Sequence, residues 1–131
     1  MEIKIDRNLL IMFIERYYRE QLDFNGKVKI RLVNETVGYY GDKVNKLDIG
    51  INGFVNLAGK EVECVVKIEE DEMKNIIKFY LQEQGYDVIK IENDIEDEHE
   101  YGCCHATGKI FKGVKVNVKK DLKLKVKKEG E

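Results

Sequence analysis

The chain has 131 residues, 43% of them hydrophobic and 37% charged, and its formal net charge is −2. This length and balance are typical of one compact globular domain, or of two small halves that share a core. A net charge this close to zero selects neither an acidic nor a basic partner.

The cysteine content and the N-terminus exclude two further classes. Three cysteines, two of them adjacent, do not form a disulfide framework and fit a reducing compartment. The N-terminus has no basic leader, and its apolar run at 9–14 is too short to cross a bilayer. We therefore expect a cytoplasmic protein with no membrane partner.

The first half predicts a strand, a helix and two further strands. Residues 2–6 alternate as a short strand, and residues 8–22 have the spacing of a helix with Asn8 as its N-cap. Alternation at 27–33 and at 46–57 predicts two half-buried strands. In the second of these strands, Gly53 suggests a β-bulge.

The second half predicts the same order of elements. A turn at 58–60 leads into it, and Gly85 is expected to end its helix. The elements expected are a strand at 61–69, a helix at 71–84, a strand at 86–92 and a hairpin of 109–118 with 122–126, turning at Lys119–Asp121.

The two halves align with each other. Residues 3–21 and 66–84 are identical at six of nineteen positions, and 51–57 can be placed over 111–117 after a three-residue shift. We therefore predict an α+β domain, 1–131, of tandem β-α-β-β repeats, about 1–59 and 60–131. The expected architecture is a mostly antiparallel sheet with two helices on one face. The connections 34–46 and 94–108 then become pseudo-equivalent loops.

One segment contains residues that could carry chemistry. His99, Cys103 and His105 are candidate metal ligands, but the segment has neither CxxC nor HExxH spacing. The carboxylates that precede Cys103 and Cys104 would keep the thiols protonated, which disfavours a redox site. We therefore predict no catalytic residue, no metal, no cofactor and no enzymatic activity, and assign no role to the Cys103–His105 segment.

Three surfaces are candidates for binding. The predicted partner-binding residues are an acidic run and the tyrosines of the two loops: Glu96, Asp97, Glu98, Glu100, Tyr39, Tyr40 and Tyr101. The first helix has apolar residues on two sides, so we predict a homodimer through Leu9, Ile11, Met12 and Tyr18. A lysine-rich hairpin would present Lys115, Lys123, Lys125 and Lys127.

The segments 66–92 and 111–120 resemble a recurring pattern in small uncharacterised proteins of phages and mobile elements of low-GC Gram-positive bacteria. The resemblance implies an accessory protein and brings no active site. The leading hypothesis is a non-enzymatic protein that binds, and inhibits, a host protein in an anti-defence role. The alternatives are a nucleic-acid-binding module that uses the lysine hairpin, and a nucleotide-type small-ligand binder at the tyrosine loops.

Overall fold

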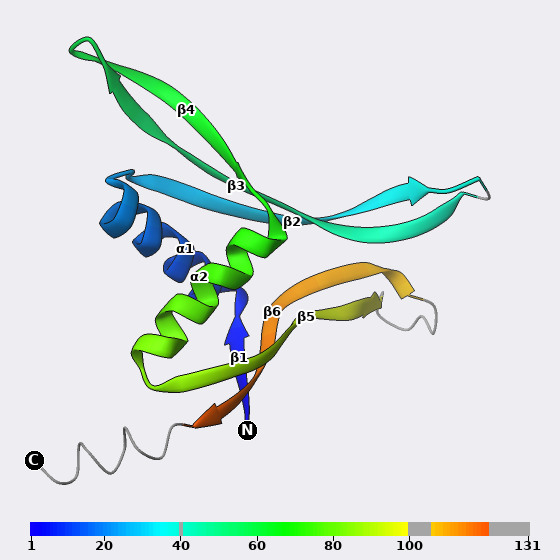
Figure 1. Cartoon of the computed structure of the whole chain (residues 1–131). Coiled ribbons are helices and arrows are strands. Elements are labelled where there is room, and N and C mark those ends of the chain that lie inside the picture. The colour runs from blue at the N-terminus through cyan, green and yellow to red at the C-terminus, as the bar shows by residue number, and fades with distance from the viewer. Residues whose placement is uncertain (40, 100–105, 121–131) are drawn as a thin grey trace, which may run out of the picture.

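A computed structural model describes residues 1–39, 41–99 and 106–120 of the chain (Figure 1). The elements are β1 (Glu2–Asp6), α1 (Arg7–Leu22), β2 (Gly26–Val37), β3 (Asp42–Leu57), β4 (Lys60–Ile68), α2 (Glu70–Glu83), β5 (Tyr86–His99) and β6 (Ala106–Lys120). The α+β class, the antiparallel pairing and the repeated β-α-β-β order are confirmed.

The expected single sheet is divided into two sheets of three strands. Their strand orders are β1-β6-β5 and β2-β3-β4, and every neighbouring pair is antiparallel. Each sheet takes two strands from one repeat and the first strand of the other. At one junction, Ala58 and Gly59 both have positive φ and turn β3 directly into β4. At the other junction, β1 pairs with β6 from the far end of the chain.

The strand register corrects the second part of the repeat alignment. Ile5 pairs with Val114 on β6, and its equivalent Ile68 pairs with Ile49 on β3. Val114 is therefore the counterpart of Ile49, and the glycines at 53 and 113 are not equivalent. Gly53 also lies in regular register rather than at a bulge. A Cβ there would come within 2.5 Å of the Asn25 carbonyl oxygen, which explains the glycine.

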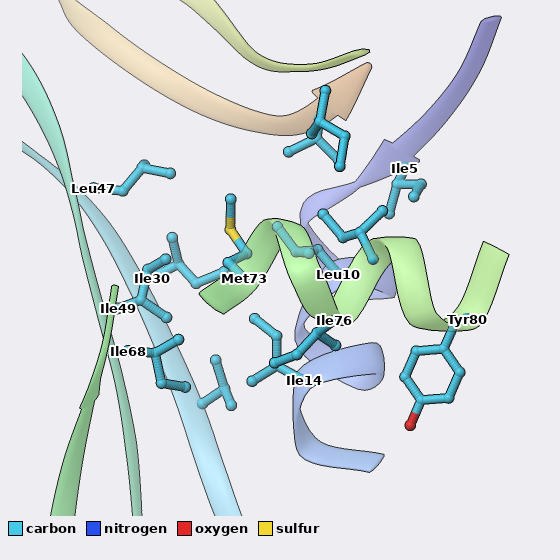
Figure 2. Close-up of a cluster of buried hydrophobic side chains, with 14 of the residues drawn as sticks. Ile5, Leu10, Ile14, Ile30, Leu47, Ile49, Ile68, Met73, Ile76 and Tyr80 are labelled. Atoms are coloured by element: carbon cyan, nitrogen blue, oxygen red, sulfur yellow. The ribbon is translucent and has the colours of Figure 1, made fainter. Parts of the chain in front are cut away.

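The two helices lie between the sheets and fill one continuous core (Figure 2). α1 packs against β2 of one sheet and β6 of the other, and α2 packs against β5. The helices contribute Leu10, Ile14, Met73 and Ile77, all with 0% exposure. These are the positions that the repeat matches between the two helices.

The second apolar side of α1 is covered mainly within the chain. Phe13 and Tyr80 have ring centroids 5.2 Å apart, so α2 meets α1 through aromatic side chains. Leu9 and Ile11 pack partly buried against the core. Tyr18 is only 6% exposed, so of the four predicted dimer residues Met12, at 56%, is the one whose side chain is largely open to solvent.

The two helix N-termini differ from the expected ones. α1 begins at Arg7 because the Asp6 carboxylate accepts a hydrogen bond of 2.8 Å from the Leu9 backbone N–H. Asn8 therefore lies inside the first turn and is not the cap. Arg7 and its repeat equivalent Glu70 each reach the same sheet, because Arg7 donates to the Ile30 carbonyl and Glu70 accepts from the Leu47 N–H.

The connections predicted as loops at 34–46 and 94–108 are mostly strand. β2 and β3 pair as far as Val37 and Asp42, and β5 and β6 pair as far as His99 and Ala106 (Figure 1). The hairpin turn predicted at Lys119–Asp121 is wrong at its start, because β6 continues through Lys119 to Lys120. Its expected second strand, 122–126, lies outside the described residues.

Candidate functional site

The outer face of the β2-β3-β4 sheet, away from the helices, carries a cluster of cations. On β2 the inward Val28 and Ile30 alternate with exposed Lys27, Lys29 and Arg31. Because side chains two residues apart share a face, these cations form a row with about 6.6 Å between neighbours. Lys46 on β3 and Lys67 on β4 point to the same side, and both are exposed. We call these five residues, Lys27, Lys29, Arg31, Lys46 and Lys67, the cationic face.

A depression lies in the middle of the cationic face. Gly50 on β3 pairs with Lys29 on one side and Lys67 on the other. Since Gly50 has no side chain, the three strands leave a hollow of about 380 Å³ above it. An added Cβ at Gly50 would meet its nearest atom, the Val66 carbonyl oxygen, only at 3.7 Å, so the space above the glycine is open.

Asp48 is the acidic side chain within this hollow. Its carboxylate accepts a hydrogen bond of 2.7 Å from Arg31 and lies 3.9 Å from the Lys67 Nζ. The hydrogen bond from Arg31, with further attraction from Lys67 and Lys46, lowers the pKa of Asp48 below its ordinary value. Asp48 therefore remains charged at neutral pH, and the cationic face still carries a clear positive excess.

The hollow continues toward an exposed aromatic side chain. A second hollow of about 340 Å³ shares Asn52 with the first, and its lining includes Lys27, Arg19, Phe54 and one acidic residue, Glu15. Phe54 is 61% exposed and lies on the same sheet face as Gly50 and Asn52. The face thus offers a row of cations that ends beside an open aromatic ring.

This arrangement is suited to binding an anionic chain. Cations at strand spacing can follow successive phosphates, and an exposed ring can stack against a base. Among the described residues, no group of three or more histidine, cysteine, aspartate or glutamate side chains is arranged to hold a metal ion.

The predicted acidic run lies on the other sheet. Glu96 and Asp97 are exposed on β5, where the hairpin extends beyond the core. Asp97 lies 4.0 Å from Lys109, and Asp94 lies 3.8 Å from Lys115, so lysines of β6 offset part of this charge. The structure describes only the backbone of Glu98, and Glu100 lies outside the described residues.

The other predicted site residues are only partly described. Tyr39 is 96% exposed beside the turn between β2 and β3. His99 ends β5, and its side chain is not described. The remaining tyrosines and metal candidates, Tyr40, Tyr101, Cys103 and His105, lie outside the described residues.

The lysine hairpin is not the cationic surface that the structure describes. Lys115 is half-buried on β6 beside Asp94, and Lys123, Lys125 and Lys127 lie outside the described residues. The alternation at 27–33 predicts the outward row of Lys27, Lys29 and Arg31, but the sequence assigns this row no role. The sequence does not place Lys67 across Gly50 from Lys29 on the same face, because that arrangement depends on the exchange of β4 into the first repeat's sheet.

No protein-family model, no curated protein and no solved structure matches this chain. Across the part of the chain that the structure describes, neither helix has the length and apolar character needed to span a membrane.

Proposed function

We propose that this protein is a non-enzymatic binding protein that holds single-stranded nucleic acid on its cationic face. The observation that supports this most directly is the positive excess around Gly50 in a chain whose net charge is −2. Local charge of this sign, against the sign of the whole chain, favours a polyanionic partner. Phe54 at the end of the row favours a single strand, since bases in a duplex are already stacked.

The binding test uses fluorescence anisotropy of labelled single-stranded oligonucleotides at about 50 mM salt, where electrostatic contacts are strong. The double variant Arg31→Gln, Lys67→Gln should bind more weakly and reduce the salt slope by about 1.4, because each lost single-strand contact contributes about 0.7. The matched control Lys78→Gln, Lys112→Gln removes two exposed lysines from other surfaces and should change little. No binding by the wild type, or equal losses in both variants, would contradict the proposal.

Two further variants separate charge from stacking. Asp48→Asn removes the acidic group of the hollow and should tighten binding, since Arg31 and Lys67 lose their internal partner. Phe54→Ala should weaken binding by about 1–3 kcal/mol without changing the salt slope, because stacking releases no counterions. If Asp48→Asn weakens binding, the cations are not the contacting groups.

A second candidate is a partner protein bound by the acidic hairpin, as the sequence hypothesis holds. The exposed carboxylates of Glu96 and Asp97, on a different sheet from the cationic face, favour it. The variant Glu96→Lys, Asp97→Lys, Glu98→Lys in a lysate pull-down tests it, and a partner retained unchanged would remove the acidic run from consideration. The phage or mobile-element origin, the host target and the anti-defence role stay predictions.

A further inference from the structure

β4 is an open edge of its sheet. In the order β2-β3-β4 it pairs, among the residues that the structure describes, with β3 alone, so one row of its backbone groups faces outward. β2 begins at Gly26, opposite Gly53, and the β3–β4 hairpin therefore continues beyond this point with only two strands. Figure 1 shows this hairpin projecting from the body of the protein. A two-stranded ribbon of this kind is only marginally stable in water.

The projecting hairpin also carries exposed apolar side chains on both faces. Phe54 and Val65 are 61% and 62% exposed on the outer face, and Leu57 and Val62 are 59% and 42% exposed on the inner one. An edge strand with apolar residues is a template for pairing with another strand. The position and exposure of these four residues therefore point to a strand partner along β4.

We propose that the partner is β4 of a second copy, paired antiparallel about a two-fold axis at Cys64. In this register Val62 lies opposite Val66 of the second copy, and both face the side of the sheet that the core occupies. Glu61 lies opposite Lys67 of the second copy on the outer face. The symmetry produces each of these pairs twice, and opposite charges across strands are stabilising.

The adjacent registers are less complementary. Centring the pair on Glu63 would place that carboxylate against its own copy. Centring it on Val65 would keep one charge pair, Glu63 with Lys67, but would place Glu61 opposite Glu69. If the two-fold axis passed between two neighbouring residues of β4, each core-facing side chain of one copy would lie opposite an outward-facing side chain of the other. The register centred on Cys64 avoids all three conflicts.

The pairing would join two sheets into one continuous sheet of six strands. Because the two-fold axis is perpendicular to the sheet, both cationic faces would lie on the same side. The self-pairing rests on the β4 edge alone and does not depend on nucleic-acid binding.

Cross-linking at Cys64 tests the register. Opposed residues of antiparallel strands have Cα atoms about 4.5–5.5 Å apart, which lies within the range that a disulfide spans. In a Cys103→Ser, Cys104→Ser background, mild oxidation with diamide should convert most of the protein into a reducible dimer. Adding Cys64→Ser to the same background should abolish it. A dimer that light scattering detects but that Cys64 does not cross-link would overturn this register.

A charge exchange tests the contact itself. Glu61→Lys and Lys67→Glu, made singly, should each raise the dimer dissociation constant roughly tenfold, and the double variant should restore it. Met12→Asn serves as the control because it removes an exposed apolar residue from the predicted dimer surface of α1 and should leave the dimer unchanged. A wild type that stays monomeric at tens of micromolar, roughly what a micromolar dissociation constant demands, would overturn the proposal. Loss of the dimer in Met12→Asn alone would move the interface to α1.

Discussion

Gly113 shows how strongly a single position of this fold depends on its neighbours. Its φ is +136°, and a Cβ added there would lie 2.0 Å from the Ile5 carbonyl oxygen, at the end of the pairing between β1 and β6. Backbone atoms cannot move away as a flexible side chain can. The glycine is therefore required both by its own conformation and by the close approach of β1.

We expect Gly113→Ala to destabilise the protein by roughly 2–4 kcal/mol, from backbone strain and overpacking together. Gly59→Ala is the matched control, because Gly59 has a φ of +83° but nothing within 4 Å of an added Cβ. It should cost only about 1–2 kcal/mol of conformational strain. Urea unfolding of the three proteins measures both values, and equal losses would show that the contact with Ile5 does not matter.

Single residues of the core were easier to predict than single glycines. The helical spacing of Leu10, Ile14 and Tyr17, matched in the second repeat, identified the positions that the core buries or half-buries. Periodicity predicts burial because it reports which side of an element is apolar. The strain at Gly113 depends on a strand more than a hundred residues earlier, and no local pattern reports that.

At the scale of elements, the N-cap of α1 differs between the sequence prediction, Asn8, and the structure, Asp6. Both Asp6 and Asn8 have side chains suited to an N-cap. Only the Asp6 carboxylate accepts from an N-terminal backbone N–H, that of Leu9. At the equivalent position of α2, Glu69 makes no side-chain cap hydrogen bond.

We therefore expect Asp6→Ala to lower the free energy of unfolding by about 1 kcal/mol, the usual value of a lost N-cap. Asn8→Ala should be neutral or slightly stabilising, since alanine favours a helix interior more than asparagine does. Thermal unfolding followed by circular dichroism compares the two variants. A larger loss for Asn8→Ala would make Asn8 the cap after all.

The existence of the helices and strands followed from the sequence, but the lengths of the hairpins did not. Beyond the core, strand pairing continues to Val37 and to His99 through segments rich in polar residues. Those segments lack the apolar alternation that marks a half-buried strand, so the pattern that predicts strands does not report them. The cationic face could not be predicted for a related reason. It forms only when β2, β3 and β4 pair in register and bring their outward cations onto one face.

For the whole molecule, the exchange of first strands means that neither repeat completes a sheet alone. The first repeat supplies β1 to the sheet of the second, and receives β4 from it. Met1 also exchanges backbone hydrogen bonds with Val118, which ties the start of the chain to β6. The two repeats should therefore fold together.

Fragments 1–58 and 59–131, divided in the exposed turn between β3 and β4, test this. Each should lack a cooperative unfolding transition alone, because each is missing one strand of its sheet and half of the core. Mixed in equal amounts, they should recover the circular dichroism spectrum of the intact chain, with a melting temperature that rises with concentration. A cooperative transition in either fragment alone would show that the repeats are independent.

The exchange of β1 and β4 also suggests how such a chain could have arisen. Two identical β-α-β-β subunits that trade their first strands would form a symmetric, domain-swapped homodimer of about sixty residues per subunit. Since β3 passes into β4 through only Ala58 and Gly59, duplicating the gene and fusing its copies would need scarcely any linker. Fusion would also free each copy to change separately, so that Leu9 could be retained on α1 while its counterpart on α2 became Glu72. A single designed repeat, built from the residues that the two halves share, should then assemble as the ancestral dimer.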